Sequence, residues 1–145
     1  MLDLPVPVTA DLIARGVCRA MEELGYAAMT EFPLGNGRRV DVIAVNGGGE
    51  TLIVEVKSCL ADFRADRKWM EYLPYCDLFY FAVPDGFPRE LIPDDCGLIV
   101  ADGYGAAILR AAPRRAMNGT RRRALTLRLA LTASQRLRRM IDPRL

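Results

Sequence analysis

Two adjacent apolar segments, residues 40–45 and 51–57, constrain the fold of this chain more than any other feature of its sequence. The first contains Asp41, and the second contains Glu55 and Lys57, each inside an otherwise hydrophobic run. Both segments have the composition of β-strands, and the Gly-rich connection at residues 46–50 predicts a hairpin. Burying an unpaired charge is costly, so core packing does not explain these three side chains. They indicate a functional site.

The register of the predicted hairpin decides whether the three charges meet. Successive side chains of a strand alternate between faces, so Glu55 and Lys57 share one face. Pairing across a five-residue loop would place Asp41 opposite Glu55, and all three groups would converge. A four-residue loop would pair Asp41 with Val54 and turn the aspartate to the other face. The predicted site therefore depends on the first register.

Length and composition are typical of one globular domain over residues 1–145, because 51% of the residues are hydrophobic. No apolar run approaches the roughly 20 residues needed to span a bilayer, and no signal-peptide pattern opens the chain. We therefore expect a cytoplasmic protein without membrane contact. The absence of histidine excludes Ser-His-Asp and Cys-His catalysis and histidine metal sites. The four cysteines form no CxxC pair, which argues against a zinc ribbon or a disulfide framework.

The remaining pattern predicts an α/β fold, a mixed β-sheet flanked by helices on both faces. Thr9 is a plausible N-cap, and Gly25 is a plausible stop for the helix between them. A helix over 60–73 between two strands is typical of a parallel crossover. The strand pair is apolar on both sides, which indicates a sheet covered on both faces. The expected elements are helices at 10–24, 60–73 and 120–140 and strands at 26–32, 40–45, 51–57, 78–83, 97–101 and 106–109.

Charge is distributed unevenly along the chain. Residues 1–102 contain 9 Lys and Arg against 17 Asp and Glu, whereas residues 103–145 contain 11 Arg against Asp142 alone. This split is typical of an acidic body with a basic segment suited to a polyanion. The alternative is that the two parts neutralise one another across an internal interface.

Asp41, Glu55 and Lys57 suit phosphodiester hydrolysis. Mg²⁺ prefers oxygen ligands and keeps several waters, so two carboxylates leave positions for water and for a phosphate oxygen. A bound metal lowers the pKa of its water and stabilises charge on the phosphoryl group. Lys57 would orient that water or neutralise the developing charge. The alternative reading of the three residues is a buried ion-pair network without catalysis.

The order helix, strand, Asp-bearing strand, Glu-x-Lys strand, helix, strand resembles the PD-(D/E)xK nuclease superfamily, which has a restriction-endonuclease-like core. More narrowly, most of the chain resembles the MmcB-like group of bacterial DNA-repair endonucleases. The segments that carry this resemblance are Arg38 to Val42, Glu55 to Ser58, Asp62-Phe63, Asp66, Lys68-Trp69, Tyr72, Cys76-Asp77 and Phe79 to Val83.

The resemblance implies a DNA-directed nuclease that depends on Mg²⁺, with Mn²⁺ as an alternative. It assigns the metal to Asp41, Glu55 and the backbone carbonyl of Val56. Many members of the superfamily also carry a glutamate early in the first helix, whereas this chain reads Leu-Ile-Ala-Arg-Gly at residues 12–16. Glu31, in the following strand, is the candidate for a supporting ligand. If no further acid reaches the site, the metal is weakly held.

Several basic residues are candidates for DNA contacts. Guanidinium groups and ammonium groups near the site could bind phosphate, and an arginine-rich helix could hold the DNA backbone. The alternative for each is a solvated surface charge. Trp69 and Tyr72 could stack on bases, but two aromatic residues three apart on a crossover helix are more often core. The candidate DNA-binding residues are Arg38, Arg39, Lys68, Arg121, Arg122 and Arg123.

These observations predict a metal-dependent DNA endonuclease that acts in DNA repair. The main alternative is a nuclease fold that binds DNA without cutting it, as an accessory repair protein. A third alternative is an oligomeric scaffold without a nucleic-acid role. The sequence leaves open the preferred DNA structure, the base specificity and whether two chains pair as a homodimer.

Overall fold

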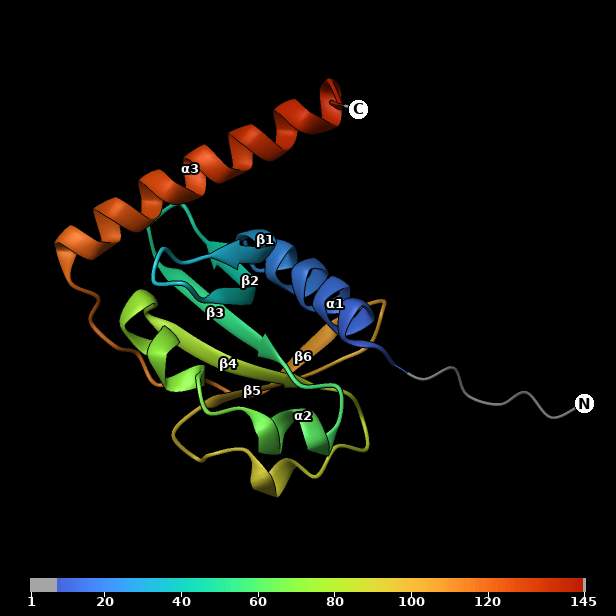
Figure 1. Cartoon of the computed structure of the whole chain (residues 1–145). Coiled ribbons are helices and arrows are strands. Elements are labelled where there is room, and N and C mark those ends of the chain that lie inside the picture. Colours follow the sequence, from blue (N-terminus) through green and yellow to red (C-terminus); the bar gives the residue numbers. More distant parts are fainter. Residues whose placement is uncertain (1–7, 145) are drawn as a thin grey trace, which may run out of the picture.

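The computed structural model describes residues 8–144 and has one six-stranded mixed sheet with helices on both faces (Figure 1). The strands lie in chain order, β1 to β6. β3, β4 and β5 are parallel, and the other neighbours are antiparallel. The predicted fold class is confirmed. The elements are α1 (Ala10–Glu23), β1 (Ala27–Pro33), β2 (Arg39–Val45), β3 (Thr51–Val56), α2 (Leu60–Ala65), η1 (Trp69–Tyr75), β4 (Leu78–Val83), η2 (Arg89–Leu91), β5 (Gly97–Ala101), β6 (Ala106–Arg110) and α3 (Gly119–Ile141).

Helix α1 covers one face of the sheet. Its Thr9 cap accepts a hydrogen bond from the backbone N–H of Leu12, as the sequence predicts. The buried α1 residues Ile13, Val17 and Met21 pack against one set of inward-facing strand residues. Gly16 allows close contact with the loop between β5 and β6, because a Cβ there would lie 1.9 Å from the backbone oxygen of Asp102.

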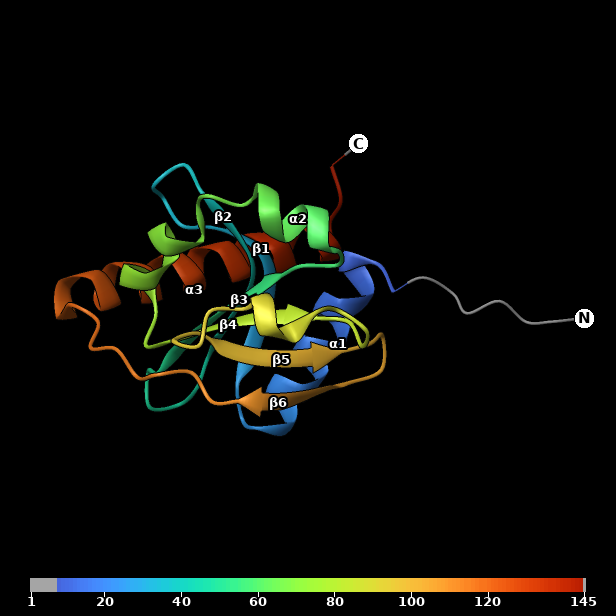
Figure 2. The ribbon, with the colours of Figure 1, turned by 90° about the horizontal axis from the view of Figure 1, so that it is seen from below.

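The opposite face is covered by α2, η1 and the first half of α3 (Figure 2). Leu125 and Leu129 of α3 are buried in this second core. Trp69 stacks on Phe79 with ring centroids 5.7 Å apart, and Tyr72 is buried, so the core interpretation of both aromatic residues is confirmed. Arg136 anchors α3 further along by donating to backbone oxygens of β1. Beyond that contact the helix projects from the body (Figure 1).

The predicted single helix over residues 60–73 is wrong. Helix α2 ends at Ala65, Asp66 has an extended backbone (φ −77°, ψ 121°), and the 3₁₀ helix η1 begins at Trp69. The physical reason is the Asp66 carboxylate, which accepts hydrogen bonds from the N–H groups of Lys68 and Trp69 and so caps a new turn. Within residues 8–144, no helix has the length and apolar character needed to cross a membrane.

Candidate active site

Asp41 and Glu55 meet at the open end of the β2–β3 hairpin. The structure pairs Val45 with Thr51 and Val42 with Val54, which is the register that the site requires. Beyond these pairs each carboxylate accepts a backbone hydrogen bond from the opposite strand. Asp41 Oδ2 accepts the N–H of Val56 at 2.7 Å, and Glu55 Oε1 accepts the N–H of Asp41 at 3.1 Å. These reciprocal bonds hold the two acids side by side.

Lys57 follows β3 directly and forms a buried ion pair with Asp66. The Nζ and Oδ2 atoms are 2.7 Å apart, and the two side chains are only 11% and 8% exposed. Asp66 also accepts the two N–H groups that begin η1, so the interrupted crossover fixes the position of the lysine. The sequence placed Asp66 within the family resemblance but gave it no role. A buried lysine needs an acidic partner, and this requirement was the signal that could have identified Asp66.

A further acidic residue, Glu31, lies beside Asp41. The β1–β2 register pairs Thr30 with Val42 and Phe32 with Val40, which places Glu31 across from Asp41. Glu31 has a left-handed backbone (φ +49°), which is unusual for a residue with a side chain. Glu31 and Asp41 line an open cavity of about 480 Å³. Its lining residues are Ala10, Asp11, Ala14, Arg15, Thr30, Glu31, Asp41 and Val56.

Asp11 was not among the residues predicted from the sequence. It lies in the first turn of α1, at the position next to the segment in which a helix glutamate was sought. Because α1 packs across the sheet with its first turn near Asp41, an acid in that turn reaches the same cavity as Glu31. Acidic side chains therefore enter this cavity from α1, β1 and β2.

Burial and mutual repulsion favour the protonated forms of the central carboxyls. Burial, followed by the charge of Asp41, raises the pKa of Glu55 to about 8. Burial also raises the pKa of Asp41, although the N–H of Val56 and the charge of Lys57 act in the opposite direction. The pKa of Tyr72 rises to about 12, because it is buried near the charges of Glu55, Asp66 and Asp41. Ionisation of both central carboxyls is therefore unfavourable unless a cation offsets their charge.

The donor set fits a hard divalent cation. Each central carboxylate uses one oxygen for a backbone N–H, and the second oxygen accepts no hydrogen bond from a backbone N–H or basic side chain of residues 8–144. Within the same residues, no three acidic or thiol side chains are grouped closely enough to hold a metal without further ligands. A cation here would be held by Asp41, Glu55, the Val56 carbonyl and water.

The candidate DNA-binding residues differ in their surroundings. Arg38 pairs with Glu71 at 2.7 Å, while Arg39, Lys68 and Arg123 are exposed. Arg121 lies over the ring of Tyr75, 4.8 Å from its centroid.

Arg122 has an internal role instead of a free guanidinium group. It forms two hydrogen bonds to Asp77, at 2.8 and 2.6 Å, and a third to the backbone oxygen of Gly49. Those contacts attach the start of α3 to the starts of β3 and β4, so the guanidinium group is not available to phosphate in this arrangement. Sequence reasoning could not separate Arg122 from its two arginine neighbours.

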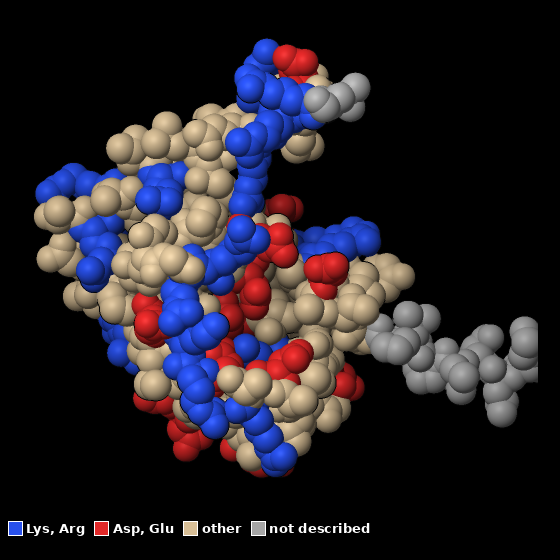
Figure 3. Space-filling view, viewed as in Figure 1, with Lys and Arg blue, Asp and Glu red and all other residues tan. Residues whose placement is uncertain are grey.

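A space-filling view shows how the charges are arranged on one face of the molecule (Figure 3). Basic side chains form a band from the projecting end of α3 down across the body, next to a hollow with acidic side chains. A polyanion bound along this band would lie beside acidic groups, which a divalent cation could bridge to phosphate.

Comparison with known proteins extends the interpretation. The family described as DNA repair protein MmcB-like matches residues 2–144. The chain belongs to the MmcB-like family. A solved structure of a protein of unknown function from Silicibacter pomeroyi has the same fold, with a TM-score of 0.90. It is 42% identical to this MmcB-like chain, and the match covers 98% of this chain and 95% of that one. The search of curated proteins gave no match.

Proposed function

We propose that this MmcB-like protein is a divalent-metal-dependent deoxyribonuclease that acts in DNA repair. The observation that carries the proposal is the reciprocal hydrogen bonding of Asp41 and Glu55 beside a buried lysine. A structural ion-pair network would not need two adjacent buried acids whose pKa values are both raised. The resemblance to PD-(D/E)xK nucleases supports the same assignment of roles.

The residues of the chain perform distinct tasks in this proposal. Asp41, Glu55 and the Val56 carbonyl would hold Mg²⁺ or Mn²⁺, with Glu31 or Asp11 as a supporting acid. The cation would polarise the phosphodiester and lower the pKa of an attacking water. Lys57 donates hydrogen bonds toward the phosphoryl oxygens, where negative charge develops. Asp66 fixes the position of the Lys57 amine through their buried ion pair.

A cleavage assay tests the proposal. Purified protein is incubated with end-labelled duplex, single-stranded, flapped and branched DNA, with Mg²⁺, with Mn²⁺ or with EDTA. We expect products only with metal, and a loss of at least about 100-fold in rate for Lys57→Ala, as for the loss of one transition-state donor. Arg89→Ala is a matched control, because Arg89 forms an exposed ion pair with Asp85. Products that persist in Asp41→Asn with Glu55→Gln would contradict the proposal.

A second candidate function is DNA binding without cleavage. The observation in its favour is the incomplete acidic set, since no three acidic or thiol groups among residues 8–144 form a metal site by themselves. For a binding protein we expect a gel shift that persists in Lys57→Ala and no product at any metal concentration. The same assay therefore separates the two functions.

A further inference from the structure

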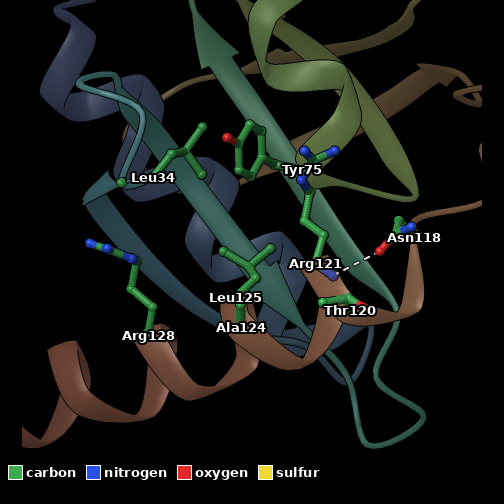
Figure 4. Close-up of a pocket in the computed structure, with 9 residues that line it drawn as sticks. Leu34, Tyr75, Asn118, Thr120, Arg121, Ala124, Leu125 and Arg128 are labelled. Atoms are coloured by element: carbon green, nitrogen blue, oxygen red, sulfur yellow. Dashed lines mark hydrogen bonds between the residues drawn. The ribbon is translucent and has the colours of Figure 1, made fainter.

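We propose that a second site, between η1 and α3, binds a nucleotide of an unpaired DNA strand. This inference deepens the proposed function and rests on its assignment of DNA as the substrate. The site is a cavity of about 470 Å³, a volume within the range of small-ligand sites. None of the residues assigned above to catalysis and metal binding lines it. The lining residues are Leu34, Gly35, Tyr75, Asn118, Thr120, Arg121, Ala124, Leu125 and Arg128 (Figure 4).

The cavity combines an aromatic ring with two arginines. Figure 4 shows Tyr75 and Arg121 next to each other at one side, and Leu125 and Leu34 around the same space. Arg128 comes from the next turns of α3 and lies against Gly35, where a Cβ would be 2.7 Å from its guanidinium nitrogen. Among residues 8–144, neither Arg121 nor Arg128 has a carboxylate partner within ion-pair distance. Arg121 lies over the ring of Tyr75, so a ligand would meet both guanidinium groups without displacing a carboxylate.

This chemistry matches both parts of a nucleotide. A base has a π-face that stacks on an aromatic ring or a guanidinium plane, and its edges pack against apolar side chains. The phosphates on either side of the base suit the guanidinium groups of Arg121 and Arg128. A peptide carboxylate would use the arginines but would leave the ring and the apolar wall unmatched. The cavity thus favours a ligand that has both a planar ring and a negative charge.

The concave shape selects an unpaired strand over a duplex. Bases in a duplex are stacked inside the helix, and only phosphates would reach the rim formed by Arg121 and Arg128. An unpaired base can turn out of its strand and enter the cavity. The turn with Leu34 and Gly35 forms one wall and continues into β2, which carries Asp41. A strand bound in this cavity would therefore contact the turn that leads into β2 and the candidate active site.

Fluorescence polarisation in EDTA tests this site independently of cleavage. The probes are a labelled oligothymidylate of 12 nucleotides and a duplex of equal length, with free thymidine monophosphate as a competitor. We expect tighter binding of the single strand, and a loss of about tenfold or more for Tyr75→Ala, in keeping with the loss of one stacked base. Tyr75→Phe should retain binding because the ring is kept. Tyr104→Ala is the matched control, since Tyr104 is an exposed tyrosine outside the cavity.

A crosslinking measurement keeps the test independent of the stability of the variants. An oligonucleotide with 5-iododeoxyuridine is irradiated on the unmodified protein, and the crosslinked peptide is identified by mass spectrometry. A crosslink at Tyr75 supports the site, and crosslinks confined to other regions overturn it. Equal losses of duplex and single-strand affinity in Tyr75→Ala overturn it, as does full competition by thymidine monophosphate at equal nucleotide concentration. Single-strand binding without nuclease activity would leave this site standing while the proposed function fails.

Discussion

In the proposed function Glu55 would exchange a proton for a cation, and its surroundings explain why. Its carboxyl is buried beside Asp41, so the neutral form is favoured when no cation is present. The backbone N–H of Asp41 fixes one carboxyl oxygen, which leaves the other to carry either the proton or the metal. Deprotonation of Glu55 would therefore accompany metal binding.

The raised pKa of Glu55 predicts how stability depends on pH. Between the ordinary value of 4.5 and about 8, the folded state holds a proton that the unfolded chain releases. The stability from this group is full below pH 4.5 and is lost as the pH rises through 8. Relative to Glu55→Gln, the free energy of unfolding should fall by up to about 1.4 kcal/mol per pH unit in this window. Urea unfolding at pH 5, 6, 7 and 8 measures it, and parallel curves would refute the assignment.

The Lys57–Asp66 pair predicts strong coupling between two residues. Asp66→Asn should cost about 3 kcal/mol of stability, because it leaves a buried ammonium group without its partner. Lys57→Met combined with Asp66→Asn should recover part of that loss, since neither charge then remains buried. Chemical unfolding of both single variants and the double variant completes the cycle. Additive losses would show that the two side chains do not interact as the structure places them.

Strands were predicted more accurately than the details of the site. The charged residues within apolar runs and the Gly-rich connection identified the β2–β3 hairpin but left two registers open, and the structure has the first of them. Strict alternation, however, puts residues three apart on opposite faces, whereas Met29 and Phe32 contact one core, as do Val40 and Ile43. The left-handed backbone at Glu31 accompanies this change. Local periodicity carries no signal for such a distortion, and none for the interruption of the crossover at Asp66.

Close packing of α1 on the sheet predicts the effect of one glycine substitution. In Gly16→Ala the new Cβ would lie 1.9 Å from the oxygen of Asp102 and 2.6 Å from that of Gly105, both backbone atoms. The helix or the β5–β6 loop must shift, at a cost of about 1–3 kcal/mol. Gly47→Ala is the control, because a Cβ there meets nothing within 4 Å. Thermal unfolding should show a lower Tm for Gly16→Ala alone; equal Tm values would contradict the contact.

The separation of charge along the chain is only partly neutralised within the molecule. Arg110 pairs with Asp94, Arg114 with Glu50 and Arg122 with Asp77, so three arginines of the basic segment bind the acidic body. Arg121, Arg123 and Arg128 have no such partner among residues 8–144. Some arginines of the basic segment thus neutralise the acidic body, while the charges of others have no carboxylate partner within residues 8–144.

This division predicts the salt dependence of DNA affinity. Removing one arginine that binds a phosphate should reduce the slope of log K against log salt by about 0.7 for a single strand. Replacing Arg121, Arg123 and Arg128 together by Gln should therefore lower the slope by about 2, whereas Arg89→Gln, whose partner Asp85 is also exposed, should leave it unchanged. Gel shifts from 50 to 300 mM KCl measure both slopes. An unchanged slope in the triple variant would mean that the band of arginines serves solubility or internal pairing, and that DNA binds this protein through other residues.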